Sequence, residues 1–193
     1  MQALRFPENE KVYQSLFNAY SEKNRFYHTF THINDCLDQL DFVRGLAEQP
    51  EEVELAIWFH DAVYHPFSSK NELKSAKWMV EFLKKNAVAD DVVQRVYHLI
   101  MATAHNVKTK TLDESIVVDV DLSILGSAAE KYKLFETNVR KEYKRVPYLI
   151  YSKKRKQLLQ DFLNRSKIYQ NSYFIEHYES QARVNLEHAI SVL

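Results

Sequence analysis

Three short segments of the chain carry histidines and aspartates whose types and spacing could bind a metal ion. His28 and His32 are four residues apart, so in a helix they would share one face and could converge on one ligand. His60 and Asp61 are adjacent and interrupt the otherwise apolar stretch 55–64. Because a buried carboxylate without a partner is unfavourable, such groups are normally paired or bound to a metal. We therefore interpret His60 and Asp61 as half of a metal site.

A third acidic position, Asp121, extends the candidate set, and Asp119 is an alternative two residues earlier. Each segment could instead have a purely structural role that does not involve a metal. Two histidines four residues apart are often exposed or hydrogen-bonded, and a buried His-Asp pair can be a satisfied hydrogen bond. Asp121 could cap a loop. The residues alone leave these alternatives open.

The elements that must position these residues are predicted to be helices. A chain of 193 residues fits one domain and can bury a sizeable core. Its two glycines and four prolines are few, and this depletion argues against a β-rich or loop-rich fold. We predict an all-α protein, a single-domain bundle of about eight helices that spans residues 1–193.

Several helix boundaries follow from the positions of apolar residues and prolines. The first helix is predicted to start at Pro7. Apolar residues recur at three- and four-residue steps over 26–43, and the helix that carries the His-Asp pair is predicted from about Glu51 to Tyr64. Residues 116–125 alternate like a strand, but no second strand exists to pair with them, so we predict helical or irregular structure there.

Charge and cysteine content narrow the expected partners and compartment. The formal net charge is zero, so nothing draws the chain globally to nucleic acid or to an anionic membrane. The single cysteine, Cys36, cannot form an internal disulfide, and no apolar run has the length of a signal peptide or a membrane span, so we expect a cytoplasmic protein. Residues 140–167 are locally basic. They form either a solvated helical face or a source of phosphate-binding arginines, Arg140 or Arg155.

Taken together, the motifs occur in an ordered series that resembles a known family. The series is similar to the HD superfamily of metal-dependent phosphohydrolases, and it most resembles a small bacterial branch of predicted metal-dependent phosphohydrolases. The resemblance spans nearly the whole chain, from about Tyr20 to Leu186. The segments that carry it include Tyr27-His28-x-x-x-His32, His60-Asp61, Asn71-Glu72, Thr103-Ala-His105, Asp119-Val-Asp121-Leu-Ser, Arg140-Lys-Glu142 and Ala182-Arg183-Val-Asn185.

The resemblance implies a ligand set for one divalent metal ion: His32, His60, Asp61 and Asp121. The Asp-Leu-Ser match favours Asp121 over Asp119 as the fourth ligand. Imidazole and carboxylate ligands suit Mn²⁺, Fe²⁺, Co²⁺, Ni²⁺ or Zn²⁺ better than Ca²⁺, and Mg²⁺ is a further candidate. The expected nucleophile is a water molecule activated by the metal.

The resemblance also implies residues that act beside the metal. His28 would be the general acid that protonates the leaving oxygen, although it could instead hydrogen-bond a neighbouring carboxylate. Glu72 is a second candidate for proton transfer, although a glutamate in the first turn of a helix is common. Asp61 could orient or deprotonate the water. Four residues are predicted to contact the substrate: Arg25, Asn71, His105 and Arg140. His105 could alternatively ligate a second metal.

These residues predict an enzyme that hydrolyses a phosphate ester or anhydride, with a nucleotide-like small molecule as its substrate. The alternative is a non-catalytic HD-fold module that senses a nucleotide or binds a partner. A third interpretation is a helical nucleic-acid-binding protein that uses the basic segment, and the zero net charge argues against it. We expect no membrane partner, and a homodimer is a further expectation.

Overall fold

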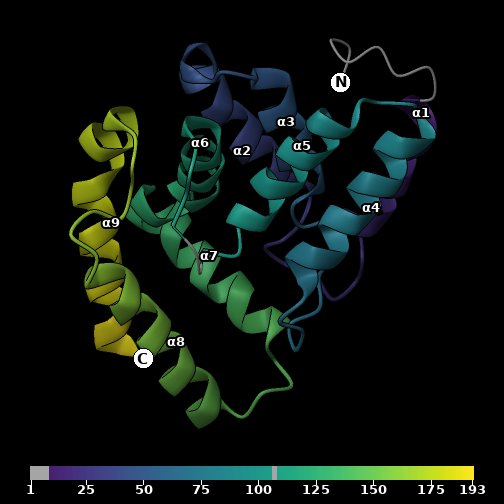
Figure 1. Cartoon of the computed structure of the whole chain (residues 1–193). Helices are drawn as coiled ribbons and strands as arrows, with labels where there is room; N and C mark the ends of the chain where they lie inside the picture. The colour runs from purple at the N-terminus through teal and green to yellow at the C-terminus, as the bar shows by residue number, and fades with distance from the viewer. Residues whose placement is uncertain (1–8, 106–107) are drawn as a thin grey trace. The chain divides into compact units, whose positions relative to one another are not determined.

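The computed structural model describes residues 9–105 and 108–193, and within these ranges the chain forms only helices and no strand. The α-helices are α1 (Asn9–Tyr20), α2 (Phe30–Val43), α3 (Pro50–Phe59), α4 (Asn71–Lys85), α5 (Asp90–Ala102), α6 (Leu112–Leu122), α7 (Ala129–Glu142), α8 (Tyr148–Leu163) and α9 (Ser172–Val192), with two 3-10 helices, η1 (Arg44–Leu46) and η2 (Ser123–Gly126) (Figure 1). The all-α prediction is confirmed.

By their contacts the helices form two compact units, the first ending at Asp121 and the second starting at Leu122. The prediction of one domain over residues 1–193 stays a prediction. The predicted start of the first helix, at Pro7, lies outside the described residues. None of the described helices combines the length and the apolar composition needed to cross a bilayer.

In the first unit α3 is the central helix. α5 packs against both α3 and α4, and α2 packs against α3 (Figure 1). α5 turns one apolar face inward, because Val93, Val96 and Ile100 recur at three- and four-residue steps. α3 buries residues on nearly every side, which is typical of a helix in the middle of a core. The residues that directly follow α3, His60 and Asp61, therefore lie next to the core of the first unit.

Two polar contacts fix the N-terminal end of α3. The carboxylate of Asp113 accepts hydrogen bonds from the backbone N–H groups of Glu48 and Gln49, at 2.8 and 2.9 Å. Arg95 on α5 donates to both carboxylate oxygens of the buried Glu52, at 2.8 and 2.7 Å. A bidentate pair fixes orientation as well as distance, so α3 is held in register by α5 and by the start of α6.

The C-terminal end of α3 differs from the prediction. The helix predicted from Glu51 to Tyr64 ends at Phe59 instead. The physical reason is competition for backbone groups. The carbonyl of Trp58 accepts a hydrogen bond from the hydroxyl of Tyr20, at 3.0 Å. The carbonyl of Ile57 lies 2.8 Å from the ring Nδ1 of His60. In a continued helix these two carbonyls would instead accept from the N–H groups of residues 62 and 61. Periodicity within one segment cannot show that a side chain from elsewhere takes one of these acceptors.

Two further sequence predictions have different outcomes. Residues 116–125 are helical, in α6 and η2, so the prediction of helical or irregular structure is confirmed. The predicted common helix face of His28 and His32 is wrong, because α2 begins only at Phe30 and His28 lies in the turn before it.

In the second unit α9 packs against η2 and α8. The side-chain amide of Asn185 on α9 donates to the carbonyls of Leu125 and Ser127, both at 2.8 Å. Gly126 lies between these two residues, and a Cβ added to it would come within 2.5 Å of the carbonyl oxygen of Tyr178. The absence of a side chain at this position therefore lets η2 approach the backbone of α9.

We expect Gly126→Ala to lower the free energy of unfolding by about 1–3 kcal/mol, because the added methyl group overlaps the backbone of α9. Gly45→Ala is the matched control, since a Cβ there meets no atom within 4 Å. It should be neutral or stabilise the protein by about 0.4–1 kcal/mol. Urea unfolding followed by circular dichroism measures both. Equal stability of the two variants would contradict the close packing of η2 on α9.

Candidate metal centre

Two imidazoles and two carboxylates from three elements of the first unit converge on one point. The contributing positions are His32 on α2, His60 and Asp61 directly after α3, and Asp121 near the end of α6. His32 Nε2 lies 3.2 Å from His60 Nε2, 3.1 Å from Asp121 Oδ1 and 3.7 Å from Asp61 Oδ2. His60 Nε2 lies 3.1 Å from Asp61 Oδ2 and 3.6 Å from Asp121 Oδ1. The structure therefore brings together the four residues predicted as metal ligands.

The five distances given above suit the ligands of a single ion, and the ligand atoms of His32, His60 and Asp61 all lie within 4.8 Å of one another. Two atoms that each lie about 2.1 Å from a metal, about 90–110° apart, are about 3.0–3.4 Å from each other. The N–O distances of 3.6 and 3.7 Å are also longer than ordinary hydrogen bonds. The donor set of imidazole nitrogens and carboxylate oxygens fits a divalent transition metal. These residues could therefore hold the ion that the resemblance implies.

The histidines and the aspartates of the cluster differ in their exposure to solvent. The side chains of His32 and His60 are each only 3% exposed, whereas those of Asp61 and Asp121 are 14% and 17% exposed. The imidazoles therefore form the buried floor of the cluster, and the carboxylates reach toward solvent at its mouth.

The ring of His60 is oriented by the last turn of α3, the helix that it follows. Its Nδ1 lies 2.8 Å from the carbonyl oxygen of Ile57, one turn earlier. When Nδ1–H donates to this carbonyl, Nε2 faces the cluster and can present its lone pair to an ion. A hydrogen bond from the far ring nitrogen to a carbonyl is the usual way in which a metal-binding histidine is oriented.

The electrostatics of the cluster are those of a buried, self-compensating group of charges. Burial alone would raise the pKa of the Asp61 carboxyl, but the charges of His60 and His28 hold it below its usual range. Burial likewise opposes ionisation of Asp121, yet hydrogen bonds from His105, His32 and His60 hold its pKa well below the usual value. Burial would lower the pKa of His60, and the two carboxylates instead raise it well above the usual value. Positive charge is therefore stabilised at the centre of the cluster.

Arg25 holds the backbone that follows α3. Its side chain is buried, and its guanidinium donates to the carbonyls of Asp61 and Ala62 at 2.6 and 3.0 Å. Its Nε also donates to Glu22 at 3.1 Å. This geometry makes Arg25 a positioning residue for Asp61. The predicted contact between Arg25 and the substrate stays a prediction.

Residues of α4 hold the next part of the same segment. The amide of the buried Asn71 accepts from the N–H of His65 at 3.1 Å and donates to its carbonyl at 3.0 Å. Ser75 Oγ accepts from the N–H of Val63 at 3.0 Å. Asn71 therefore stabilises the turn after the His-Asp pair, and its predicted contact with the substrate stays a prediction.

His28 and Glu72, the two predicted proton-transfer residues, occupy different positions. The ring of His28 stacks on that of Tyr64, with centroids 4.0 Å apart, and lies 6.1 Å from the ring of His32. His28 is therefore beside the ligand atoms. Glu72 is half-buried in the first turn of α4, and its carboxylate is not among the clustered ligand atoms. Both catalytic roles stay predictions.

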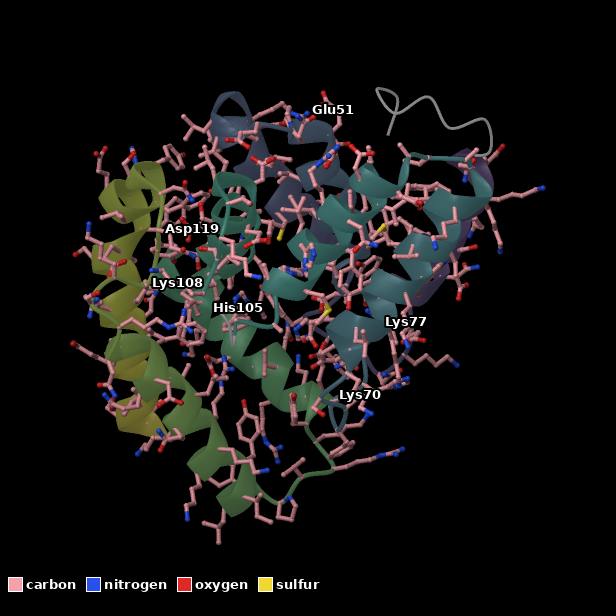
Figure 2. The ribbon with its side chains drawn as sticks, in the orientation of Figure 1. Glu51, Lys70, Lys77, His105, Lys108 and Asp119 are labelled. Atoms are coloured by element: carbon pink, nitrogen blue, oxygen red, sulfur yellow. The ribbon has the colours of Figure 1, made fainter. Side chains whose placement is uncertain are left out.

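His105 supports Asp121 from the side away from the two floor histidines. Its Nε2 lies 2.9 Å from Asp121 Oδ2, while Oδ1 faces His32 and His60. His105 follows α5 with φ of 54°, a left-handed conformation that is uncommon for a residue with a Cβ and is often found at functional sites. The other candidate acid, Asp119, is fully buried in α6 and is not part of the cluster; Figure 2 labels both His105 and Asp119.

Arg140, the fourth predicted substrate contact, belongs to the second unit. Its guanidinium donates to the carbonyls of Tyr143 and Val146 at 2.5 and 3.1 Å and thereby closes the turn after α7. Its predicted role in binding substrate stays a prediction.

One residue near the cluster was missed by the sequence reasoning. Cys36 is buried one helical turn after His32, and its Sγ lies 3.7 and 3.8 Å from the two ring nitrogens of His32. A group of His32, Cys36 and Asp121 could also hold an ion. The signal was present in the sequence, because Cys36 follows His32 at four-residue spacing.

Comparison of the chain with protein-family models, with curated proteins and with solved structures finds no match. Membership of the HD superfamily therefore stays a prediction that rests on the order of the motifs.

We expect Arg25→Lys to weaken metal binding by about tenfold or more without removing a ligand, because a lysine ammonium lacks the planar fork that spans the carbonyls of Asp61 and Ala62 and the carboxylate of Glu22. Arg44→Lys is the control, since Arg44 is partly exposed and pairs with Glu54 at the surface of the unit. Titration of the chelator-treated protein with Zn²⁺ or Mn²⁺ by calorimetry measures both affinities. Equal affinities for the two variants would contradict the positioning role of Arg25.

Proposed function

We propose that the protein is a metal-dependent phosphohydrolase that cleaves a phosphate ester or anhydride bond of a nucleotide-like small molecule. The observation that carries the proposal is the convergence of His32, His60, Asp61 and Asp121. The Nε2 atom of each imidazole lies 3.1–3.7 Å from the other imidazole and from both carboxylates. The resemblance of the ordered motifs to the HD superfamily supports the reaction class.

In this proposal the four residues hold one ion of Mn, Fe, Co, Ni, Zn or Mg. Such an ion, when bound, lowers the pKa of a water molecule and polarises a phosphoryl oxygen. Asp61 would hold the ion through Oδ2, the oxygen that lies 3.1 Å from His60 Nε2, and its position at the mouth of the cluster suits it to orient the attacking water. Arg25 keeps Asp61 in place through the backbone.

His28 is the proposed proton donor to the leaving oxygen. Its ring lies beside the ligands, supported by Tyr64, and its charge acts on Asp61. A histidine can give up a proton near neutral pH, and general acids typically contribute about 10²–10⁴ to a rate. His105 and Asn71 support neighbouring groups through hydrogen bonds, so they help to keep the mouth of the cluster in shape.

We expect Asp61→Ala to abolish both metal retention and activity, because it removes a ligand. His28→Ala should retain the metal and lower kcat by about 10²–10⁴. His177→Ala is the control, because His177 is exposed on α9, and it should change neither property. Metal content by elemental analysis and phosphate release from nucleotides with Mn²⁺, Co²⁺ or Ni²⁺ measure these effects.

The same experiment separates the alternatives. Loss of metal in His28→Ala would contradict its role as a proton donor. No metal binding and no turnover of any substrate would contradict the proposed function. Tight nucleotide binding without hydrolysis would favour the non-catalytic sensing or partner-binding module.

The pKa shifts predict how the stability of the metal-free protein depends on pH. In the metal-free protein, the raised pKa of His60 stabilises the fold fully below about pH 6.5, and this contribution is lost as pH rises through the raised pKa. The lowered pKa values of Asp61 and Asp121 stabilise it fully above about pH 3.8, and this contribution is lost as pH falls through the lowered values. The cluster therefore stabilises the metal-free protein most between about pH 4 and 6.5.

An ion must displace the proton that His60 holds in this range. We therefore expect the rise in melting temperature on adding metal to increase from pH 5.5 to pH 8, with release of about one proton per ion. Melting curves across this range and calorimetry in two buffers of different ionisation enthalpy measure the two quantities. A metal-induced rise that is larger at pH 5.5 than at pH 8 would be the contrary result.

A further inference from the structure

The two units of the chain carry opposite net charge. The second unit, which starts at Leu122, has 13 lysines and arginines against 7 aspartates and glutamates, whereas the first unit has 13 against 19. Such asymmetry between two parts of a chain indicates that the basic part contacts an anionic partner. The expectation of no membrane partner rests on the zero net charge of the whole chain, which conceals this difference.

Exposed apolar side chains gather at the start of α8, within the second unit. Tyr148, Leu149 and Ile150 form its first turn, here called the apolar tip, and they are 52%, 81% and 51% exposed. The helix itself is anchored, because its buried face includes Leu159 and Phe162. Neighbouring exposed apolar residues on a folded protein mark a surface that contacts a protein or a membrane. The apolar tip is therefore a candidate contact surface.

Exposed cations bracket the apolar tip. The two cations at 144–145 lie in the turn that joins α7 to α8, and Lys153 and Lys154 lie one helical turn after the tip (Figure 1). Because residues four apart share one side of a helix, these two lysines lie beside the two aliphatic residues of the tip. Between residues 141 and 160 the one acidic residue is Glu142, and it is buried. The surface around the tip therefore favours an anionic partner.

The turn before the apolar tip has a fixed shape. The guanidinium of Arg140 donates to the carbonyls of Tyr143 and Val146, at 2.5 and 3.1 Å. The carbonyl of Pro147 accepts a hydrogen bond from the N–H of Ile150 at 3.0 Å, and the proline ring fixes its own φ angle. The tip and its cations are therefore presented together, and a partner does not have to order a flexible loop.

We propose that the start of α8 binds an anionic lipid bilayer, with Leu149 and Ile150 inserted among the acyl chains and the flanking cations at the headgroup phosphates. Tyr148 suits the same position, because tyrosine side chains are enriched at the boundary between membrane and water. A nucleic acid would match the cations but would leave the aliphatic side chains uncovered. A symmetric contact with a second copy of the chain would place like charges opposite one another.

The proposal uses no residue of the metal centre, so it stands or falls independently of the proposed hydrolysis. The test is sedimentation of the full-length protein with vesicles of phosphatidylcholine, either alone or with about one third phosphatidylserine. We expect saturable binding to the vesicles that contain phosphatidylserine. Binding to phosphatidylcholine alone should be at least about tenfold weaker, because each cation near an anionic surface contributes about fivefold.

Two double variants separate the apolar contribution from the charge. The variant Leu149→Ser, Ile150→Ser should weaken binding to the phosphatidylserine vesicles by at least about tenfold, since it removes the inserted side chains. The variant Lys153→Gln, Lys154→Gln should also weaken it by about tenfold or more, and it keeps the apolar tip. All four side chains are exposed, so neither variant should change the melting temperature.

Each double variant has a matched control. Leu158→Ser removes a leucine that is 46% exposed on the opposite side of the same helix from Leu149. The variant Lys84→Gln, Lys85→Gln removes two adjacent exposed lysines from α4, in the first unit. Neither control should change the affinity for the vesicles by more than about twofold, because neither site adjoins the tip.

Four results would overturn the proposal. They are no saturable binding to the phosphatidylserine vesicles, equal binding to both kinds of vesicle, unchanged binding of the Leu149→Ser, Ile150→Ser variant, and unchanged binding of the Lys153→Gln, Lys154→Gln variant. Absence of vesicle binding together with a dimer that Leu149→Ser, Ile150→Ser dissociates would show that a second copy of the chain covers the tip instead.

Discussion

The balance of charge between two buried imidazoles and two carboxylates is the constraint on which the first unit depends. Each of these groups would be strongly unfavourable if it were buried alone, and their mutual contacts make the arrangement tolerable. α2, the end of α3 and the end of α6 must therefore meet with ångström accuracy. The bidentate pair of Arg95 with Glu52 holds one end of α3, and Arg25 holds the backbone after its other end.

The helical class and the identity of the clustered residues could be predicted because both leave periodic or ordered signals in the chain. The scarcity of glycine and proline, and apolar residues at helical spacing, led to an all-α fold. His60, Asp61 and Asp121 could be chosen because they stand in apolar sequence, and His32 because it lies four residues after His28. The order of the four residues is also similar to that of a known family. Residues 116–125 alternate like a strand, but the chain has no second strand to pair with them, and this absence correctly predicted that they do not form a strand.

What could not be predicted depends on contacts between segments far apart in the chain. The end of α3 at Phe59 depends on Tyr20, more than thirty residues earlier, whose hydroxyl donates to the carbonyl of Trp58, and no local pattern records that contact. The hydrogen bond from His105 to Asp121 likewise depends on where the loop after α5 lies.

The arrangement of imidazoles at the floor and carboxylates at the mouth gives the cluster a direction. In the metal-free cluster the proton on His60 compensates one of the two carboxylates, so a phosphorylated molecule that approaches the mouth still meets an excess of negative charge until a cation binds. Under the proposed function, binding is therefore ordered, with the cation first and the anionic molecule second, and departure follows the reverse sequence. Depletion of divalent cations would then prevent association itself and not only the chemical step.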